Sequence, residues 1–127
     1  MAEKTIDIAS PILSRNERLA DQLRQRFEQT NTYVINVLSS PGSGKTTTIL
    51  GTNERLRDKA GLRCAVIEGD IASDVDAITM KEAGMPAIQI NTGGLCHLEG
   101  NMIMEAVDAF DQAVGLDNID VIFIENV

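Results

Sequence analysis

A glycine-rich run at residues 39–46 has the composition of a loop that binds phosphate. It reads Ser39-Ser40-Pro41-Gly42-Ser43-Gly44-Lys45-Thr46, which is the Walker A pattern G-x-x-x-x-G-K-[ST] with serine in place of the first glycine. Gly42 and Gly44 have no side chains, so consecutive backbone N–H groups can turn inward around a phosphate. Lys45 can then reach the β- and γ-phosphates, and the hydroxyl of Thr46 can hold Mg²⁺.

The sequence on either side of this run favours a phosphate-binding loop over a turn whose lysine is only solvated. Residues 33–38 are apolar and β-branched, which predicts a buried strand. Residues 46–60 predict a helix that ends at Gly61, and the positive end of its dipole would face the anion. The residues expected to bind the nucleotide phosphates are Pro41, Gly42, Ser43, Gly44, Lys45, Thr46 and Thr47.

Two carboxylates end other predicted strands on the same side of the sheet. Asp70 follows the strand predicted at 63–68, and Glu125 follows the strand predicted at 121–124. A nucleoside triphosphate requires Mg²⁺, and this hard cation prefers carboxylate and water ligands. Asp70 is therefore a candidate Mg²⁺ ligand. Glu125 resembles a Walker B residue, which binds Mg²⁺ through water or orients the attacking water. The alternative is that either carboxylate only caps a following helix or loop.

The only histidine of the chain, His97, stands beside one of its two cysteines, Cys96, in a glycine-rich loop after the strand predicted at 87–91. Thiolate and imidazole suit Zn²⁺ or Ni²⁺. Two adjacent ligands do not close a metal site, so others must come from elsewhere, most simply from the same loop of a second subunit. From spacing alone, a pair without a metal role is the better interpretation. The other cysteine, Cys64, lies in a predicted strand and is expected to be a core residue.

The first predicted helix begins at Ser14. The run Ser14-Arg15-Asn16-Glu17 matches a capping box, in which serine and glutamate satisfy each other's free backbone donors. Leu19, Leu23 and Phe27 recur every four residues and form an apolar stripe. We expect this stripe to pack against the sheet, and a surface for a partner protein is the alternative.

Helices predicted at 73–83 and at about 98–113 alternate with the strands. This alternation predicts an α/β fold of the P-loop NTPase kind, with about four parallel strands, right-handed crossovers and helices on both faces. Ligands of such sheets bind at the carboxyl ends of the strands. The phosphate loop, Asp70, the Cys96-His97 pair and Glu125 all fall at that end.

The composition excludes several classes of function. The chain has 127 residues, enough for one domain, and a net charge of −8, which disfavours nucleic acid and anionic membranes as partners. No apolar run approaches the ~18 residues that span a membrane, and the amino terminus lacks the layout of a signal peptide. Two distant cysteines do not suggest a disulfide framework. We therefore expect a soluble, cytoplasmic protein.

Several segments together resemble the HypB family of hydrogenase nickel-incorporation GTPases. The resemblance covers about residues 34–127 and rests on residues 39–47, 65–70 (Ala-Val-Ile-Glu-Gly-Asp), 86–89 (Pro-Ala-Ile-Gln), 91–98 (Asn-Thr-Gly, then Cys-His-Leu) and 123–127 (Phe-Ile-Glu-Asn-Val). It implies a GTPase that binds GTP and GDP with Mg²⁺ and helps to deliver nickel to a [NiFe]-hydrogenase. The related urease accessory family UreG has a proline between its cysteine and histidine. This chain has none, which favours the hydrogenase branch.

The resemblance also implies roles for single residues and for partners. Residues 42–47 would hold the phosphates, and Thr46, Asp70 and Glu125 would serve Mg²⁺. Cys96 and His97 become ligands of Ni²⁺ or Zn²⁺ at the interface of a homodimer, which reverses the interpretation from spacing alone. The implied partners are other hydrogenase maturation proteins and the precursor of the hydrogenase large subunit.

The chain departs from the family pattern in several places. The cysteine-rich nickel motif that some members carry near the amino terminus is absent, as is any histidine-rich tract. The further cysteine that completes the metal site and the Asn-Lys-x-Asp motif that selects guanine are also absent. We therefore expect a G domain that is truncated at its carboxyl end, with a helical region at 1–31 and the nucleotide- and metal-binding core at 32–127.

Two alternatives to a GTPase remain. The first is a P-loop kinase that phosphorylates a small molecule, for which the sequence shows no arginine-bearing lid. The second is a metal-binding dimerisation module that works without nucleotide. Whichever function holds, a four-stranded sheet as short as this one has an edge that favours pairing, so we expect self-association or domain exchange of the chain.

Overall fold

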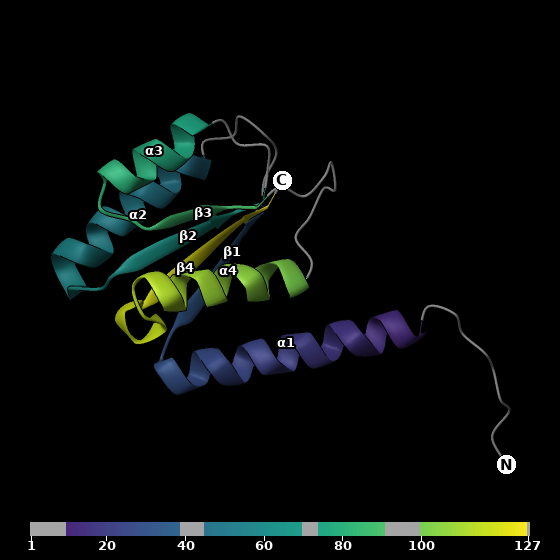
Figure 1. The fold of residues 1–127 in the computed structure, drawn as a ribbon. Helices are drawn as coiled ribbons and strands as arrows, with labels where there is room; N and C mark the ends of the chain where they lie inside the picture. The colour runs from purple at the N-terminus through teal and green to yellow at the C-terminus, as the bar shows by residue number, and fades with distance from the viewer. Residues whose placement is uncertain (1–9, 39–44, 70–73, 91–99, 127) are drawn as a thin grey trace, which may run out of the picture.

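One parallel sheet forms the centre of the molecule in the computed structural model, which describes residues 10–38, 45–69, 74–90 and 100–126 (Figure 1). Within these ranges the strands are β1 (Tyr33–Leu38), β2 (Cys64–Glu68), β3 (Ala87–Gln89) and β4 (Val121–Asn126). Their order in the sheet is β1-β4-β2-β3, so that β4 pairs with both β1 and β2. The predicted strands are confirmed, although β3 ends at Gln89, earlier than predicted.

Helices cover both faces of the sheet, as predicted. Helices α2 (Lys45–Ala60) and α3 (Asp74–Glu82) lie on one face, and α4 (Gly100–Ala113) lies on the other, with α1 (Ser10–Thr30) alongside it (Figure 1). The two faces carry separate core clusters because side chains alternate along each strand. Val66 and Phe123 belong to the cluster beneath α2, whereas Ile67 and Ile124 belong to the cluster beneath α4.

The predicted helix boundaries hold for α2 and fail for α1. Helix α2 ends at Ala60, and Gly61 follows with φ +66°, the left-handed conformation in which glycine commonly ends a helix. Helix α1 begins at Ser10, so the predicted capping box at Ser14 lies inside the helix and that prediction is wrong. Pro11 does not stop the helix because it falls in the first turn, where a missing N–H loses no intrahelical hydrogen bond.

The apolar stripe of α1 packs with α4 in a core cluster that also contains residues of the sheet. Leu23 is buried in a cluster with Val107 and Phe110 of α4, and the sheet residues Ile122 and Ile124 belong to the same cluster. Arg26 of α1 also forms an ion pair with Asp108 of α4. The helix therefore reaches the core as the outermost layer on this side (Figure 1). None of the described helices is both long and apolar enough to span a membrane.

Strand β1 exposes large apolar side chains at the edge of the described sheet. Among the described strands it pairs only with β4. Tyr33 is 77% exposed, Ile35 42% and Val34 37%. An apolar edge strand is a template for pairing with another chain.

We expect the 127-residue chain to self-associate through β1, and Ile35→Lys to shift it toward monomer. The substitution places a charge on the apolar edge, which is a common obstacle to edge-to-edge pairing. Static light scattering over a concentration series measures the effect. The matched control is Ile78→Lys on α3, since Ile78 is also exposed, at 54%, but lies away from β1. A wild-type chain that stays monomeric, or an equal response to both substitutions, would show the prediction to be wrong.

Candidate functional site

The predicted phosphate-binding elements meet at the carboxyl end of the sheet. Strand β1 ends at Leu38, and α2 begins at Lys45 and continues through Thr46, so the predicted strand–loop–helix order is confirmed at both ends of the loop. Thr46 is partly buried and Thr47 is exposed. The amino end of α2 presents backbone N–H groups and the positive end of a 16-residue helix dipole, which favour an anion.

Two glutamates stand side by side at this end of the sheet, on the face that α2 covers. Glu68 ends β2 and pairs in register with Glu125 of β4. Val66 and Phe123, two positions before Glu68 and Glu125, belong to the cluster beneath α2. Side chains two positions apart on a strand point to the same face of the sheet, so both glutamates face α2 as well. Glu68 is 0% exposed and Glu125 is 7% exposed. The fold therefore buries two carboxyl groups next to each other, close to where the phosphate loop joins α2.

Burying two carboxylates together is costly unless positive charge or protons compensate them. A divalent cation supplies that charge. Carboxylate oxygens are the ligands that Mg²⁺ prefers, whereas Ni²⁺ and Zn²⁺ favour nitrogen and sulfur. The Glu68–Glu125 pair, with the Thr46 hydroxyl at the start of α2, therefore has the donor chemistry that suits Mg²⁺ bound to a nucleotide. When bound, Mg²⁺ would neutralise charge on the phosphate oxygens.

The structure places only part of the predicted site. Glu125 lies within β4, not after it, and is buried, so the alternative that it caps a following helix or loop does not fit its position. Outside the described residues lie Asp70, Cys96 and His97, and also Pro41, Gly42, Ser43 and Gly44, so their predicted roles stay predictions. Among the residues that are described, no group of three or more His, Cys, Asp and Glu side chains could hold a metal ion.

Glu68 is not among the site residues predicted from the sequence. The available signal was a charged residue at the end of the strand Cys64–Glu68, which is otherwise apolar and buried throughout. Such a residue is rarely buried without a partner or a ligand. Its pairing with Glu125 depends on the strand order, which the sequence pattern did not provide.

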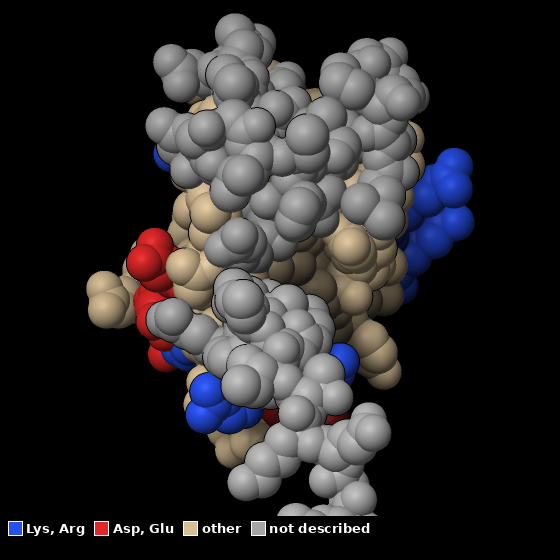
Figure 2. Space-filling view, turned by 90° about the vertical axis from the view of Figure 1, so that its right-hand side faces the viewer, with Lys and Arg blue, Asp and Glu red and all other residues tan. Residues whose placement is uncertain are grey.

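Figure 2 views the molecule from this end. The described side chains visible near its centre are uncharged, whereas Lys, Arg, Asp and Glu side chains are seen toward the edges. The amino end of α2 adds an electropositive feature to this end of the sheet.

The substitution Glu68→Gln should raise the Mg²⁺ concentration needed for nucleotide binding by about tenfold, since groups that support a metal ligand typically contribute 10- to 100-fold in metal affinity. Glutamine keeps the size of the side chain and removes its charge. Titration of a fluorescent guanine nucleotide at increasing Mg²⁺ measures the change, and circular dichroism confirms that the variant is folded. Glu54→Gln on the exposed side of α2 is the control. An unchanged Mg²⁺ midpoint in folded Glu68→Gln would remove Glu68 from the site.

Comparison with known proteins identifies relatives over the whole of this site. A family profile described as "CobW/HypB/UreG, nucleotide-binding domain" matches residues 33–127. The hydrogenase maturation factor HypB of Azotobacter chroococcum is 45% identical over 124 residues, which cover 98% of this chain and 39% of that protein. The hydrogenase/urease maturation factor HypB of Helicobacter hepaticus is 42% identical over 125 residues, covering 98% and 50%.

Solved structures show the same fold. The crystal structure of HypB from Helicobacter pylori in complex with nickel matches with a TM-score of 0.76 and 38% identity, over 89% of this chain and 51% of that one. HypB from Archaeoglobus fulgidus matches with a TM-score of 0.76 and 32% identity, over 90% and 52%. The chain thus spans about half the length, or less, of these relatives. Since the family profile covers β1, the phosphate loop, α2 and both glutamates, the chain belongs to the CobW/HypB/UreG family of nucleotide-binding domains.

Proposed function

We propose that the chain is the nucleotide- and metal-binding segment of a GTP-hydrolysing metallochaperone that assists nickel insertion into a [NiFe]-hydrogenase. The observation that carries the proposal is the joint placement of a helix start at Lys45 of the Walker A pattern and a buried Glu68–Glu125 pair. The chain that carries them is 45% identical to the hydrogenase maturation factor HypB of Azotobacter chroococcum. The nickel-bound relative with the same fold supports nickel as the cargo. We propose a cytoplasmic location.

In this function the amino end of α2 binds and orients the nucleotide. Backbone N–H groups of residues 42–47 hold the phosphates, and Lys45 stabilises the charge on the β- and γ-phosphates. Mg²⁺ would be held by Thr46, Asp70 and Glu125, and the neighbouring carboxylate of Glu68 would add negative charge to the site. Glu125 orients the attacking water. Lys45, Asp70 and Glu125 are thus the residues proposed to carry hydrolysis.

Nickel is the cargo, and Cys96 with His97 are its proposed ligands at the interface of a homodimer. Both residues belong to the segment between β3 and α4, which connects to the carboxyl end of the sheet. Nucleotide exchange at that end can therefore alter the arrangement of the two metal ligands. Other hydrogenase maturation proteins and the precursor of the hydrogenase large subunit are the proposed partners that receive the metal.

The proposal is tested by measuring Ni²⁺ affinity in the presence of GDP and of a non-hydrolysable GTP analogue, together with phosphate release from GTP. If the nucleotide and metal sites are coupled, the Ni²⁺ affinity measured with GDP should differ from that measured with the GTP analogue by a factor of about 5 to 150. Equal Ni²⁺ affinities would contradict coupling. Because the chain has no Asn-Lys-x-Asp motif, ATP is included to measure base selectivity.

The same assays separate the two alternatives. Phosphate transfer from ATP to a small acceptor, without release of inorganic phosphate, would support a P-loop kinase. Retained metal binding by a chain that binds no nucleotide would support a metal-binding dimerisation module. Slow GTP hydrolysis is compatible with the proposal, because intrinsic rates of switch GTPases without an activating arginine are on the order of 10⁻⁴–10⁻² s⁻¹.

A further inference from the structure

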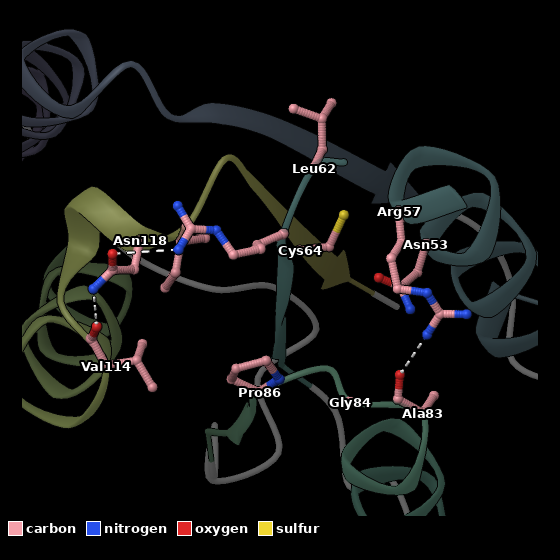
Figure 3. A pocket seen from close by; sticks show the side chains of 11 residues that line it. Asn53, Arg57, Leu62, Cys64, Ala83, Gly84, Pro86, Val114 and Asn118 are labelled. Carbon is pink, nitrogen blue, oxygen red and sulfur yellow. Dashed lines mark hydrogen bonds between the residues drawn. The ribbon is translucent and has the colours of Figure 1, made fainter. Parts of the chain in front are cut away.

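A pocket with a volume of about 240 Å³ opens at the opposite end of β2 from the candidate nucleotide site (Figure 3). Cys64, the first residue of β2, lines it, whereas Glu68 is the last residue of the same strand. Four residue steps of about 3.3 Å separate the two, or about 13 Å. Helix α2 and the segments that precede β3 and β4 form its other walls. The pocket is therefore a separate site.

The walls of this pocket are mostly apolar. They include Leu62, Cys64, Pro86, Val114 and Ile119. Burial raises the pKa of the Cys64 thiol to about 11, with a smaller contribution from Asp120, so the thiol is neutral near pH 7 and behaves as part of the apolar wall. At about 30 Å³ for each water-sized group, the volume accommodates about eight such groups, which is the size of a small aryl or short alkyl body.

One polar side chain inside the pocket lacks an internal partner. Asn53 of α2 is 6% exposed and lines the pocket. Its carboxamide forms no hydrogen bond with another residue of the described chain, in contrast to Asn118, whose Nδ2 donates to the Val114 carbonyl at 2.7 Å. The amide of Asn53 is not among the fully buried, unpartnered polar groups of the described residues, so it is open to the pocket, where a ligand can replace its water. Asn53 can thus form a hydrogen bond with a polar group of a ligand in this pocket.

Two arginines indicate the charge of that group. Arg57 and Arg63 both line the pocket, and their side chains are 55% and 60% exposed. Arg57 contacts Asp58, and its Nη1 donates to the Ala83 carbonyl at 3.5 Å, which Figure 3 shows beside Gly84. Arg63 contacts Asp120 and Asn118. These ion pairs are exposed and therefore weak, and each guanidinium keeps further donors for an anion.

We propose that this pocket binds a small carboxylate with an apolar body. The body would occupy the space between Cys64, Pro86 and Ile119, and the carboxylate would accept hydrogen bonds from the Asn53 amide and from a guanidinium at the mouth. Arginine is suited to this role because its planar donors match a carboxylate. The proposal concerns a ligand site at the amino end of β2 and does not depend on nucleotide or nickel binding.

The test uses phenylacetate as the probe and its neutral analogue phenylacetamide as the matched ligand. Titration of the ¹⁵N-labelled chain should produce saturable NMR shifts at Leu62–Cys64 and at Gly84, with a Kd on the order of millimolar for a ligand of this size. Phenylacetate should bind more tightly than phenylacetamide. Shifts that do not saturate, or that fall at the carboxyl end of the sheet instead, would overturn the proposal.

Variants locate the interaction. Arg57→Gln should weaken the binding of phenylacetate about threefold to fivefold, a modest loss because the Arg57 side chain is 55% exposed. The affinity for phenylacetamide should be nearly unchanged. Arg55→Gln, two residues earlier on α2 and not part of the lining, is the control. Asn53→Leu keeps the size and removes the amide, so it should weaken both ligands. If neither Arg57→Gln nor Asn53→Leu alters binding while the chain remains folded, the assignment is wrong.

Discussion

Replacing Lys45 with alanine should reduce affinity for a guanine nucleotide with Mg²⁺ by at least about 100-fold. Removing one partner of a close charge pair in a binding site typically costs 2–5 kcal/mol, and 100-fold corresponds to about 2.7 kcal/mol. Lys45 is the first residue of α2, so the substitution removes the charge beside the helix amino end and leaves the helix backbone intact. Isothermal titration calorimetry with GDP and a non-hydrolysable GTP analogue measures the loss.

The control for this prediction is Lys59→Ala, which removes the same charge from the last turn of the same helix. Nucleotide affinity should change less than twofold in this variant, since long-range interactions between exposed charges are screened. Equal losses in both variants would mean that net charge, not the phosphate loop, governs binding. Unchanged affinity in Lys45→Ala would remove the assignment of residues 39–46 as a phosphate-binding loop.

Replacing either Cys96 or His97 with alanine should abolish stoichiometric binding of Ni²⁺ and Zn²⁺. We expect the wild-type chain to bind about one metal ion per dimer, because two adjacent ligands from each subunit supply the four that such metals commonly use. Metal titration with light scattering in parallel measures stoichiometry and oligomeric state together. If metal binding requires only one of the two residues, the hypothesis that Cys96 and His97 of both subunits hold one metal ion is wrong.

Cys64→Ala is the matched control for the metal prediction, because it removes the only other thiol of the chain. Cys64 is buried in β2, and the high pKa of its thiol disfavours the thiolate that a metal requires. Metal affinity should therefore be unchanged in Cys64→Ala. Loss of metal binding in this variant would move the site away from Cys96 and His97.

Local sequence patterns predicted the secondary structure well. Apolar β-branched runs marked β1, β2 and β4, and Gly61 correctly marked the end of α2. The start of α1 was predicted wrongly because the local pattern there is compatible with more than one helix boundary. The Ser14 capping box had the right residue types, but Pro11 and its neighbours also continue a helix, and α1 includes both.

Only the part of the candidate site that lies in one continuous sequence motif could be predicted from the sequence. Residues 39–46 form one segment, so their spacing alone indicated phosphate chemistry. Glu68 gave no comparable signal, because its relevance depends on the strand that lies beside it. The same holds for the pocket at the amino end of β2, which brings together Asn53 and Arg57 of α2, Cys64 of β2 and Ile119 before β4.

Sequence patterns were enough to predict the class of the fold and the order of strands and helices, which the structure confirms, and they also predict a phosphate-binding loop at residues 39–46. These follow from hydrophobic periodicity and from glycine and lysine placement, which act over a few residues. The structure was needed to show that β4 lies between β1 and β2, which buries Glu125 beside Glu68, and that α1 packs on α4. The physical reason is that strand pairing and burial depend on contacts between residues far apart in the chain, and these contacts have no signature in any local pattern.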